Sequence, residues 1–345
     1  MLRIGVVGTG NVGANHHIPA YKSMGHKVTV VAVADVVEEQ ARRCAERFSI
    51  PHYFTDYDEM LRTIDLDAVS VCVPNALHSE IVIAAIEKGC HVLCEKPPAV
   101  TSQQAEAMRN VSQTNSKILT YGFHYRFKPE VRLVTHFAER LGEIYAINVN
   151  ATRRRGIPGW GQYGNRDLQG GGALMDFGVH SLDSALFIMG YPQPDVVFAC
   201  SYRKFGNKPG WGFMGSWDWG NFNVEDMLRG IVRFKNGASL LFQTAFSANV
   251  GENQTVKISL MGTEGGAEVF PPTIFGEEYG ALTNMAVITP PTDNPRRELI
   301  DAFVDSCITE QVNKWLPTPQ QGYELQSLLE AIYKSADSGE PITVH

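Results

Sequence analysis

The sequence predicts two domains, an α/β domain with a doubly wound parallel sheet followed by an α+β domain with a largely antiparallel open sheet. The chain has 345 residues, of which 44% are hydrophobic, and this is enough for about two cores at roughly 150 residues per domain. Short apolar runs alternate with longer amphipathic runs up to about residue 123, and strand-like runs then follow one another directly. We therefore expect domains at residues 1–123 and 124–345, with the C-terminal helix able to pack back on the first.

The first domain is predicted from runs that are short and mostly β-branched, separated by runs with helical spacing. Strands are expected at residues 3–7, 28–34, 68–73, 91–94 and 117–121, and helices at 11–24, 37–48, 77–88 and 102–113. Pro19 should bend or interrupt the first helix. Strand–helix alternation of this kind implies right-handed crossovers and a parallel sheet covered by helices on both faces.

The second domain lacks regular crossover helices between its strand candidates. After a helix at 129–141, strands are expected at residues 143–153, 196–204, 228–234, 239–246 and 255–261, and helices at 296–309 and 320–338. Lys235-Asn236-Gly237 is typical of a tight turn between two antiparallel strands. The aromatic and glycine-rich residues 208–223 are predicted to form a long loop.

Charge and cysteine content exclude several classes of protein. The formal charge of −7 disfavours a protein that binds nucleic acid by neutralising phosphates. The sequence has no run of about 18 apolar residues and no secretory signal, so we expect a cytoplasmic protein without membrane association. The six cysteines are scattered, which predicts buried thiols instead of disulfides. We expect no metal site, because the adjacent His16 and His17 have no carboxylates at ligand spacing.

A glycine-rich turn follows the first predicted strand and opens the first helix. It consists of Gly8, Thr9, Gly10, Asn11, Val12 and Gly13. The first glycine permits a tight turn, the second lets a diphosphate approach the backbone, and the third lets the helix pack on the strand. The N–H groups at the helix start would then face the diphosphate. The motif alone is weak and also fits a plain turn, so the interpretation depends on its context.

Asp35 supplies that context, because it lies 22 residues beyond Gly13 at the end of the second predicted strand. A carboxylate there accepts hydrogen bonds from the ribose hydroxyls of NAD and repels the additional phosphate of NADP. The next residues are Val36 and Val37 instead of an arginine. The sequence thus favours NAD, with NADP as the alternative cofactor and a strand-end cap as the alternative role of Asp35.

Three later segments, together with the glycine-rich turn, resemble the Gfo/Idh/MocA family of nicotinamide-dependent oxidoreductases, which includes inositol dehydrogenases and glucose-fructose oxidoreductase. The segments are Glu95-Lys96-Pro97 directly after a strand, the run from Gly170-Gly171-Gly172 through Asp176 to His180, and Gly262-Thr263-Glu264-Gly265. The match covers nearly the whole chain in the right order. The resemblance implies a Rossmann domain followed by a domain that binds substrate and forms oligomers.

The run that ends in His180 also has the periodicity of a helix with two faces. Apolar residues gather on one side at about 100° per residue, and they are Leu174, Phe177, Leu182, Ala185, Leu186 and Met189. Asp176, His180 and Asp183 gather on the other side, at spacings that bring them into contact. This arrangement leaves the polar groups available for a site, although a solvated face or a histidine hydrogen-bonded in the core has the same pattern.

The resemblance implies that Lys96, Asp176 and His180 converge on the nicotinamide as catalytic and substrate-binding residues. His180 would take the hydroxyl proton, because an imidazole titrates near neutral pH. Lys96 would hydrogen-bond the same oxygen, and Asp176 would bind a substrate hydroxyl and position His180. The Lys-Pro bond is often cis in this family, so Pro97 is a candidate for that geometry. Asp183 is interpreted as a positioning residue, and an exposed strand-end charge is the alternative for Lys96.

Further residues are assigned less specifically. Pro74, Asn75, His78 and Glu95 are expected near the nicotinamide ribose, in addition to Lys96. Arg126 is expected to donate to substrate oxygens, with a salt bridge at the domain junction as the alternative. One or two residues of the run Arg153-Arg154-Arg155 are candidates for the pocket, because alternation along a strand sends the middle residue to the opposite face. Trp160, Tyr163 and Trp211 could stack on a sugar ring or cover the core.

We expect an enzyme, an NAD(P)-dependent dehydrogenase that transfers a hydride between NAD(H) and a secondary alcohol or ketone of a sugar, polyol or inositol. The alternatives are an NAD-dependent, redox-assisted glycosidase and a non-enzymatic nucleotide-binding regulator. The resemblance also implies a homodimer or homotetramer formed through the open sheet, where Leu240, Phe242 and Phe246 alternate along a strand. Neither the particular carbohydrate or cyclitol nor the physiological direction follows from the sequence.

Overall fold

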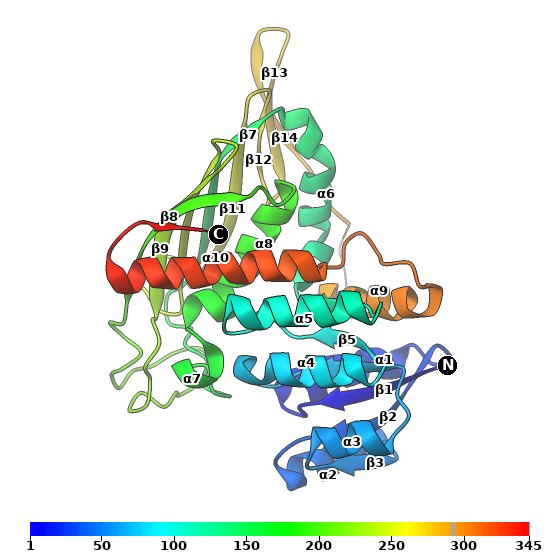
Figure 1. Cartoon of the computed structure of the whole chain (residues 1–345). Helices are drawn as coiled ribbons and strands as arrows, with labels where there is room; N and C mark the ends of the chain where they lie inside the picture. The colour runs from blue at the N-terminus through cyan, green and yellow to red at the C-terminus, as the bar shows by residue number, and fades with distance from the viewer. Residues whose placement is uncertain (291–293, 345) are drawn as a thin grey trace. The chain divides into compact units, whose positions relative to one another are not determined.

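The computed structural model describes residues 1–290 and 294–344, which divide into two compact units (Figure 1). The first unit contains Met1–His124 and Asn294–Gln326, and the second contains the rest of the described chain. The second unit begins at Tyr125, whereas the sequence analysis placed the start of the second domain at residue 124. The second domain is not the continuous segment 124–345, because residues 294–326 belong to the first unit.

The first unit is built on a six-stranded sheet in the order β3-β2-β1-β4-β5-β6, in which every pair is parallel. The strands are β1 (Leu2–Val7), β2 (Val28–Ala34), β3 (His52–Phe54), β4 (Ala68–Val71), β5 (His91–Cys94) and β6 (Leu119–Tyr121). The strand order reverses between β1 and β4, and ligands of such sheets bind at this switch point. The predicted doubly wound Rossmann sheet is confirmed.

The first unit contains helices of several lengths, some of which begin with a side-chain cap. They are η1 (Gly13–His17), α1 (Ile18–Ser23), α2 (Glu38–Phe48), α3 (Tyr57–Thr63), η2 (Asn75–Leu77), α4 (His78–Glu87), α5 (Ser102–Thr114), η3 (His124–Phe127), of which only His124 belongs to this unit, and α9 (Pro295–Thr309). Thr101 and Gln104 form a capping box that starts α5, and the side chain of Asn294 caps α9. The first helix changes from a π turn to an α-helix just before Pro19, in agreement with the predicted interruption.

The second unit contains a nine-stranded sheet in the order β14-β13-β12-β11-β7-β10-β9-β8-β15. Its strands are β7 (Ile144–Arg153), β8 (Pro194–Tyr202), β9 (Met227–Phe234), β10 (Ser239–Ala245), β11 (Gln254–Gly262), β12 (Gly266–Glu268), β13 (Thr273–Glu278), β14 (Ala281–Ala286) and β15 (Ile342–Thr343). Among the described strands of this sheet only the β7–β10 pair is parallel, so the expected largely antiparallel character is confirmed.

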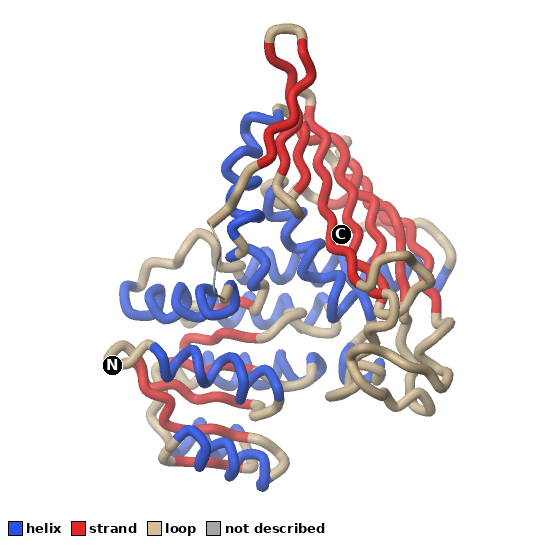
Figure 2. The backbone as a smooth tube through the Cα atoms, turned by 180° about the vertical axis from the view of Figure 1, so that it is seen from behind, coloured by secondary structure: helices blue, strands red, loops and turns tan. Residues whose placement is uncertain are grey.

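Helices of the second unit lie on one side of this sheet (Figure 2). They are α6 (Pro129–Phe137), η4 (Ala138–Leu141), α7 (Arg166–Gln169), η5 (Leu174–Gly178) and α8 (Val179–Ile188), and α10 (Pro319–Ser338) contributes residues to both units. Residues 203–226, between β8 and β9, contain neither helix nor strand, as predicted for the greater part of this loop.

The two faces of the second sheet differ in what they expose. Leu240, Phe242 and Phe246 are buried, so they belong to the core and do not form the open face that was expected to carry them. The side chains of a strand alternate between faces, and Leu241 is therefore exposed on the opposite side. It pairs across the sheet with Ile231, which in turn pairs with Phe198, and both are exposed. The uncovered face thus carries the apolar row Phe198, Ile231 and Leu241.

The cysteines are unpaired, and the described residues contain no cluster of metal ligands. All six cysteines are free thiols, four of them buried, whereas Cys72 and Cys200 are only partly buried, in contrast to the expectation that all would be buried. Across residues 1–290 and 294–344, no group of three or more His, Cys, Asp or Glu side chains is arranged to hold a metal ion. None of the described helices is both long and apolar enough to cross a membrane.

Candidate active site

The three glycines of the turn between β1 and η1 have different surroundings in the structure. Gly8 has a positive φ of 92°, and a Cβ atom there would lie 2.3 Å from the carbonyl oxygen of Cys72. A Cβ atom at Gly13 would lie 2.0 Å from the carbonyl oxygen of Gly8. At Gly10 a Cβ atom would meet no other part of the protein within 4 Å. Packing therefore explains Gly8 and Gly13, whereas the open space at Gly10 fits the approach of a diphosphate.

Asp35 lies at the end of β2 and is hydrogen-bonded to this turn. Its Oδ2 accepts hydrogen bonds from the backbone N–H of Thr9 at 2.8 Å and from the Thr9 hydroxyl at 2.9 Å. Its Oδ1 accepts from the backbone N–H of Val37 at 3.0 Å. The carboxylate therefore stabilises the glycine-rich turn and remains half-buried at the edge of the sheet, where an NAD ribose is bound in this fold.

Glu95 is held by a buried hydrogen-bond network that the sequence analysis missed. Its Oε1 lies 3.0 Å from His17 Nε2, and His17 Nδ1 lies 3.1 Å from the hydroxyl oxygen of Ser70, which is 2.6 Å from the Tyr21 hydroxyl. Burial disfavours the carboxylate, but the His17 hydrogen bond and the charge of Arg296 outweigh burial and lower the pKa of Glu95. Glu95 is consequently ionised, and its Oε2 accepts from the backbone N–H of Lys96 at 3.2 Å.

His17 could not be recognised as the partner of Glu95 from the sequence, because the two residues are 78 positions apart and the first helix has no motif that relates them. The signal available was a histidine on a helix that follows the glycine-rich turn. The sequence analysis considered the His16-His17 pair only for metal binding.

His78 was expected to contact the cofactor, but the structure places it in the protein interior. The imidazole is fully buried, with Nδ1 2.9 Å from the Pro97 carbonyl oxygen and Nε2 3.0 Å from that of Val73. Burial lowers its pKa, although the two carbonyl groups oppose this. Because no surface of His78 is exposed, its role is to join the loops after β4 and β5, and it is not available to a cofactor.

The remaining expected residues of the first unit are placed near these loops. Pro74 precedes η2, and Asn75, which is buried, begins it. Lys96 directly follows Glu95 at the end of β5 and is half-buried. The Lys96–Pro97 peptide bond is cis, as the resemblance implied. The turn, Asp35 and Lys96 thus all follow the carboxyl ends of parallel strands of one sheet, as the Rossmann fold requires of a dinucleotide site.

The second unit brings Asp176 and His180 together at the start of one helix. Asp176 lies in the π turn η5, and His180 follows in α8. The His180 ring stacks on Tyr125 with a centroid distance of 4.9 Å and an interplanar angle of 21°. Asp176 Oδ2 is 4.0 Å from Nη1 of Arg153. The two polar groups therefore occupy a defined place in this unit, and π turns often occur at functional sites.

Arg153 differs from its two basic neighbours. Its guanidinium lies 3.9 Å from the centre of the Phe177 ring, and burial lowers its pKa while Asp176 opposes that shift. Arg154 and Arg155 instead donate to the carbonyl groups of Gly251 and Ala248, respectively. Arg153 is consequently the member of the run that lies beside Asp176.

The helix that carries His180 is not amphipathic in the way that the sequence suggested. Every residue of α8 is buried except Phe187, which is half-buried, and Asp183 is completely buried. The apolar periodicity described one packing surface correctly, but a second surface of the helix is buried by Arg126 and its neighbours. The polar residues therefore face protein as well as a site.

Arg126 was expected to contact the substrate, but the structure pairs it with a buried carboxylate. Its side chain is fully buried, and Nε and Nη2 donate to the two carboxylate oxygens of Asp183 at 2.9 and 2.6 Å. Tyr191 also donates its hydroxyl hydrogen to Asp183, at 2.6 Å. The guanidinium lies 4.4 Å from the centre of the Phe187 ring. This bidentate pair anchors α8 inside the second unit, so Arg126 is structural, and the salt bridge considered as its alternative forms within one unit.

Glu225 is a second residue that the sequence analysis missed. Its two carboxylate oxygens accept hydrogen bonds from the backbone N–H groups of Gly172 and Leu174, at 2.9 and 3.1 Å. The Tyr333 hydroxyl donates to the same carboxylate at 2.8 Å. Burial raises the pKa of Glu225, although these three donors oppose the shift. A carboxylate at this position complements the positive end of the helix that carries Asp176 and His180.

The glycine run before this helix is explained by the same contacts. A Cβ atom at Gly171 would lie 2.0 Å from the Tyr333 hydroxyl oxygen, and one at Gly172 would lie 2.1 Å from the Glu225 carbonyl oxygen. The sequence offered only this glycine run as a signal, and no motif marks the distant residues Glu225 and Tyr333 as its partners.

The fold defines a class, that of oxidoreductases with a dinucleotide-binding Rossmann domain and a second domain built on a large, mostly antiparallel sheet. Family models match both parts, as the NAD-binding Rossmann fold of the GFO_IDH_MocA oxidoreductase family at residues 2–123 and as its C-terminal alpha/beta domain at residues 138–344. The chain belongs to this family, which confirms the resemblance, and it is an NAD-dependent dehydrogenase.

Several relatives and structures are similar over most of the chain. D-glucoside 3-dehydrogenase of Escherichia coli is 36% identical over 340 residues, which cover 98% of this chain and 96% of that protein. Myo-inositol 2-dehydrogenase of Thermotoga maritima is 27% identical over 259 residues, which cover 74% and 72%. The fold is also that of levoglucosan dehydrogenase in complex with NADH, with a TM-score of 0.85, 22% identity and coverage of 100% and 99%.

Proposed function

We propose that the enzyme oxidises a secondary alcohol of a sugar, polyol or cyclitol with NAD, or reduces the corresponding ketone with NADH. The observation that carries the proposal is that Asp176 and His180 lie within one helical segment, while the other unit keeps the glycine-rich turn, Asp35 and Lys96. The names of the relatives support this substrate class, because a glucoside and an inositol are both neutral polyhydroxyl rings. No residue described above favours the glycosidase or the regulator.

The roles of the residues follow from their chemistry. Bound NAD would supply the hydride acceptor. His180 accepts the proton of the reacting hydroxyl in oxidation and returns it in reduction, since imidazole serves in both directions near neutral pH. Lys96 donates a hydrogen bond to the same oxygen and stabilises negative charge on it. Asp176 accepts a hydrogen bond from a neighbouring substrate hydroxyl and helps to position His180. We therefore propose these three as the catalytic and substrate-binding residues.

The cofactor site is proposed to consist of the turn Gly8 to Gly13 with Asp35, Pro74, Asn75, Glu95 and Lys96. Asp35 selects NAD over NADP because its carboxylate accepts from ribose hydroxyls and repels a phosphate. In Asp35→Ser, the dissociation constant for NAD should rise about tenfold or more, and the preference over NADP should fall. Asp65→Ala, an exposed residue of the same unit, is the matched control. Unchanged preference in Asp35→Ser would refute this role.

The test of the activity is a screen of the purified enzyme for NADH formation with a panel of hexoses, methyl glucosides and cyclitols. We expect turnover with at least one of them. Lys96→Ala should lower kcat about 10²- to 10³-fold, as expected when a donor to the reacting oxygen is removed. The absence of turnover across the panel, or full activity of Lys96→Ala, would contradict the proposal.

We also propose that the enzyme acts in the cytoplasm as a homodimer or homotetramer that packs its open sheets together. The exposed row of Phe198, Ile231 and Leu241 supports this assembly, because adjacent apolar side chains on an uncovered sheet face favour a partner. Leu241→Asp should shift the mass measured by light scattering toward the monomer. A wild-type monomer at micromolar concentration would contradict the proposal.

A further inference from the structure

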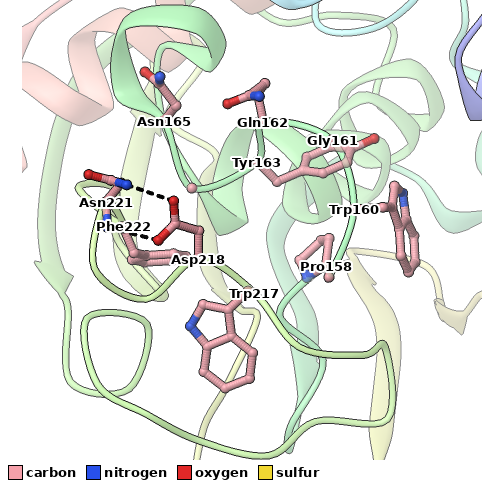
Figure 3. A pocket seen from close by; sticks show the side chains of 12 residues that line it. Pro158, Trp160, Gly161, Gln162, Tyr163, Asn165, Trp217, Asp218, Asn221 and Phe222 are labelled. Atoms are coloured by element: carbon pink, nitrogen blue, oxygen red, sulfur yellow. Dashed lines mark hydrogen bonds between the residues drawn. The ribbon is translucent and has the colours of Figure 1, made fainter.

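A pocket in the second unit is lined by Trp160 and Tyr163, which the sequence offered as candidates for stacking on a sugar ring, and by residues that have been given no role above. It has a volume of about 390 Å³, within the range of about 300 to 1,000 Å³ that is typical of sites for small molecules. Two segments line it, residues 158–165 after β7 and residues 217–222 in the long loop before β9. Figure 3 shows Trp160 and Tyr163 on one side and the Asp218–Asn221 pair on the other.

Hydrogen bonds join residues 158–165 to the long loop before β9 and connect two parts of that loop. The backbone N–H of Gly159 donates to the Met214 carbonyl oxygen at 3.0 Å, and that of Asn223 donates to the Gly164 carbonyl oxygen at 2.9 Å. The indole N–H of Trp217 donates to the Gly206 carbonyl oxygen at 2.7 Å. The pocket is therefore a built feature of the two loops, with a defined arrangement of its side chains.

Glycines let the two segments approach closely. A Cβ atom at Gly159 would lie 2.6 Å from the carbonyl oxygens of Met214 and Ser216, and one at Gly164 would lie 2.8 Å from the Phe222 ring. Phe222 itself is buried and forms part of the back of the pocket. Close packing against Phe222 therefore forms one wall of the pocket.

The lining has the chemistry that recognises a neutral sugar. Asp218 and Asn221 are hydrogen-bonded to each other through Asp218 Oδ2 and Asn221 Nδ2 at 2.7 Å, and both are exposed. Carboxylate and amide groups at one place accept from and donate to adjacent hydroxyls. All the lining residues are described, and none of them is Lys, Arg or His, so a phosphate or a nucleotide would meet no positive charge.

Aromatic side chains complete this chemistry. Trp160 is 44% exposed and Tyr163 is half-buried beside it. The faces of aromatic rings carry partial negative charge, which attracts the C–H groups on the face of a pyranose ring. The lining of the pocket therefore offers aromatic stacking surfaces and, in Asp218 and Asn221, partners for hydroxyl groups.

The pocket is connected by packing to the residues around Asp176. Phe222 belongs to a buried cluster that includes Phe177, the residue after Asp176. The loop that provides Asp218 also places Phe213 against Gly156, where a Cβ atom would lie 2.8 Å from the Phe213 ring and 2.4 Å from Cδ of Arg153. Arg153 is the residue beside Asp176. The same two loops thus surround the pocket and reach the neighbourhood of Asp176.

We infer that this pocket is a subsite for a neutral sugar ring, and that the preferred substrates are glycosides with a second ring beyond the one that is oxidised. Trp160 stacks on that second ring, and Asp218 with Asn221 binds its hydroxyls. The inference rests on the proposed function for the identity of the oxidised ring. Binding of the second ring can be measured separately, because it needs neither NAD nor turnover.

The experiment compares a two-ring ligand, cellobiose, with a one-ring ligand, methyl β-D-glucoside, on the full-length protein. Dissociation constants are measured by calorimetry for the wild type and for Trp160→Ala, Trp160→Phe and Asp218→Asn. The wild type should bind cellobiose about tenfold more tightly than the methyl glucoside, and Trp160→Ala should remove most of this difference. Trp160→Phe should keep part of this difference, because phenylalanine retains a flat aromatic ring at the same position of the loop.

Trp211→Ala is the matched control, since Trp211 is a 75% exposed tryptophan of the long loop that carries Asp218 but does not line the pocket. It should keep the preference for cellobiose. Equal affinity of the wild type for both ligands would overturn the inference, as would an equal loss for both in Trp160→Ala. Absence of NADH formation together with selective, Trp160-dependent binding of cellobiose would refute the proposed activity and leave the subsite standing.

Discussion

Tyr333 donates a hydrogen bond of 2.8 Å to Glu225, a residue 108 positions earlier in the chain. The same Glu225 carboxylate accepts the backbone N–H groups of Gly172 and Leu174, just before Asp176. A residue of the last long helix therefore fixes the start of the helix that carries Asp176 and His180. We propose that Glu225 and Tyr333 act as positioning residues, because their hydrogen bonds hold the start of this helix without any contact to the substrate.

Tyr333→Phe should lower kcat for the sugar about three- to tenfold and the free energy of unfolding by about 1 kcal/mol, the usual value of one buried hydrogen bond. The dissociation constant for NAD should stay the same, because the cofactor site belongs to the other unit. Kinetics, NAD titration and urea unfolding measure the three quantities. Tyr279→Phe is a matched control at a fully exposed residue. An equal effect on NAD binding and kcat would show that Tyr333 has only a general structural role.

Gly10→Ala and Gly13→Ala should separate cofactor binding from folding. A Cβ atom at Gly10 meets nothing in the protein, so Gly10→Ala should unfold at nearly the wild-type temperature and bind NAD at least tenfold more weakly. A Cβ atom at Gly13 would lie 2.0 Å from the Gly8 carbonyl oxygen, so Gly13→Ala should unfold at a lower temperature even without NAD. Thermal unfolding without NAD and an NAD titration distinguish them. Wild-type NAD affinity of Gly10→Ala would contradict the proposed diphosphate site.

Arg126→Ala should destabilise the second unit by about 3–5 kcal/mol, because it leaves the buried carboxylate of Asp183 without its partner. The double variant Arg126→Met with Asp183→Leu should be less destabilised, since it removes both buried charges. Urea unfolding measures both. If Arg126→Ala instead kept wild-type stability and raised only KM for the sugar, the assignment of Arg126 as a structural residue would be wrong.

The Glu95 network predicts a loss of stability in acid. The pKa of Glu95 is lower in the folded protein than its usual value of 4.5, so the folded state favours the carboxylate. Its contribution is present above about pH 4.5 and is lost as the pH falls toward the folded pKa. Glu95→Gln should therefore show a weaker decrease in the urea midpoint between about pH 5 and about pH 3 than the wild type does. Parallel curves for the two proteins would contradict the assigned pKa direction.

The elements predicted correctly from the sequence are those with enough residues to show the periodicity of a strand or a helix. The seven-residue strand β2 and the helices α2, α4 and α5 lie within one or two residues of their expected bounds. The strands β3, β12 and β15 were missed because they have only two or three residues. All residues of the strands β13 and β14 are partly or fully exposed, so these strands show no alternation of apolar and polar positions.

The residues of the candidate site could be predicted where they form a motif of neighbouring positions. They could not be predicted where the interacting residues are far apart in the sequence. The glycine-rich turn, Asp35 and the Asp176–His180 spacing can be read from neighbouring positions. His17, Glu225 and Tyr333 have no such signal, because their contacts exist only after the chain has folded. Arg126 and His78 were assigned to ligands because polar residues near a site were assumed to be exposed, whereas both are fully buried and bonded to the protein.

The central claim is that Lys96 and His180 act on one hydroxyl group of the same substrate. A double-mutant cycle of kcat/KM with Lys96→Ala, His180→Ala and the double variant tests it directly. Each single variant should lose about 10²- to 10³-fold, and the double variant should lose little more than the worse single variant, because residues that act as a unit are not additive. Losses that multiply in the double variant would mean that the two side chains work independently, and this would contradict the account.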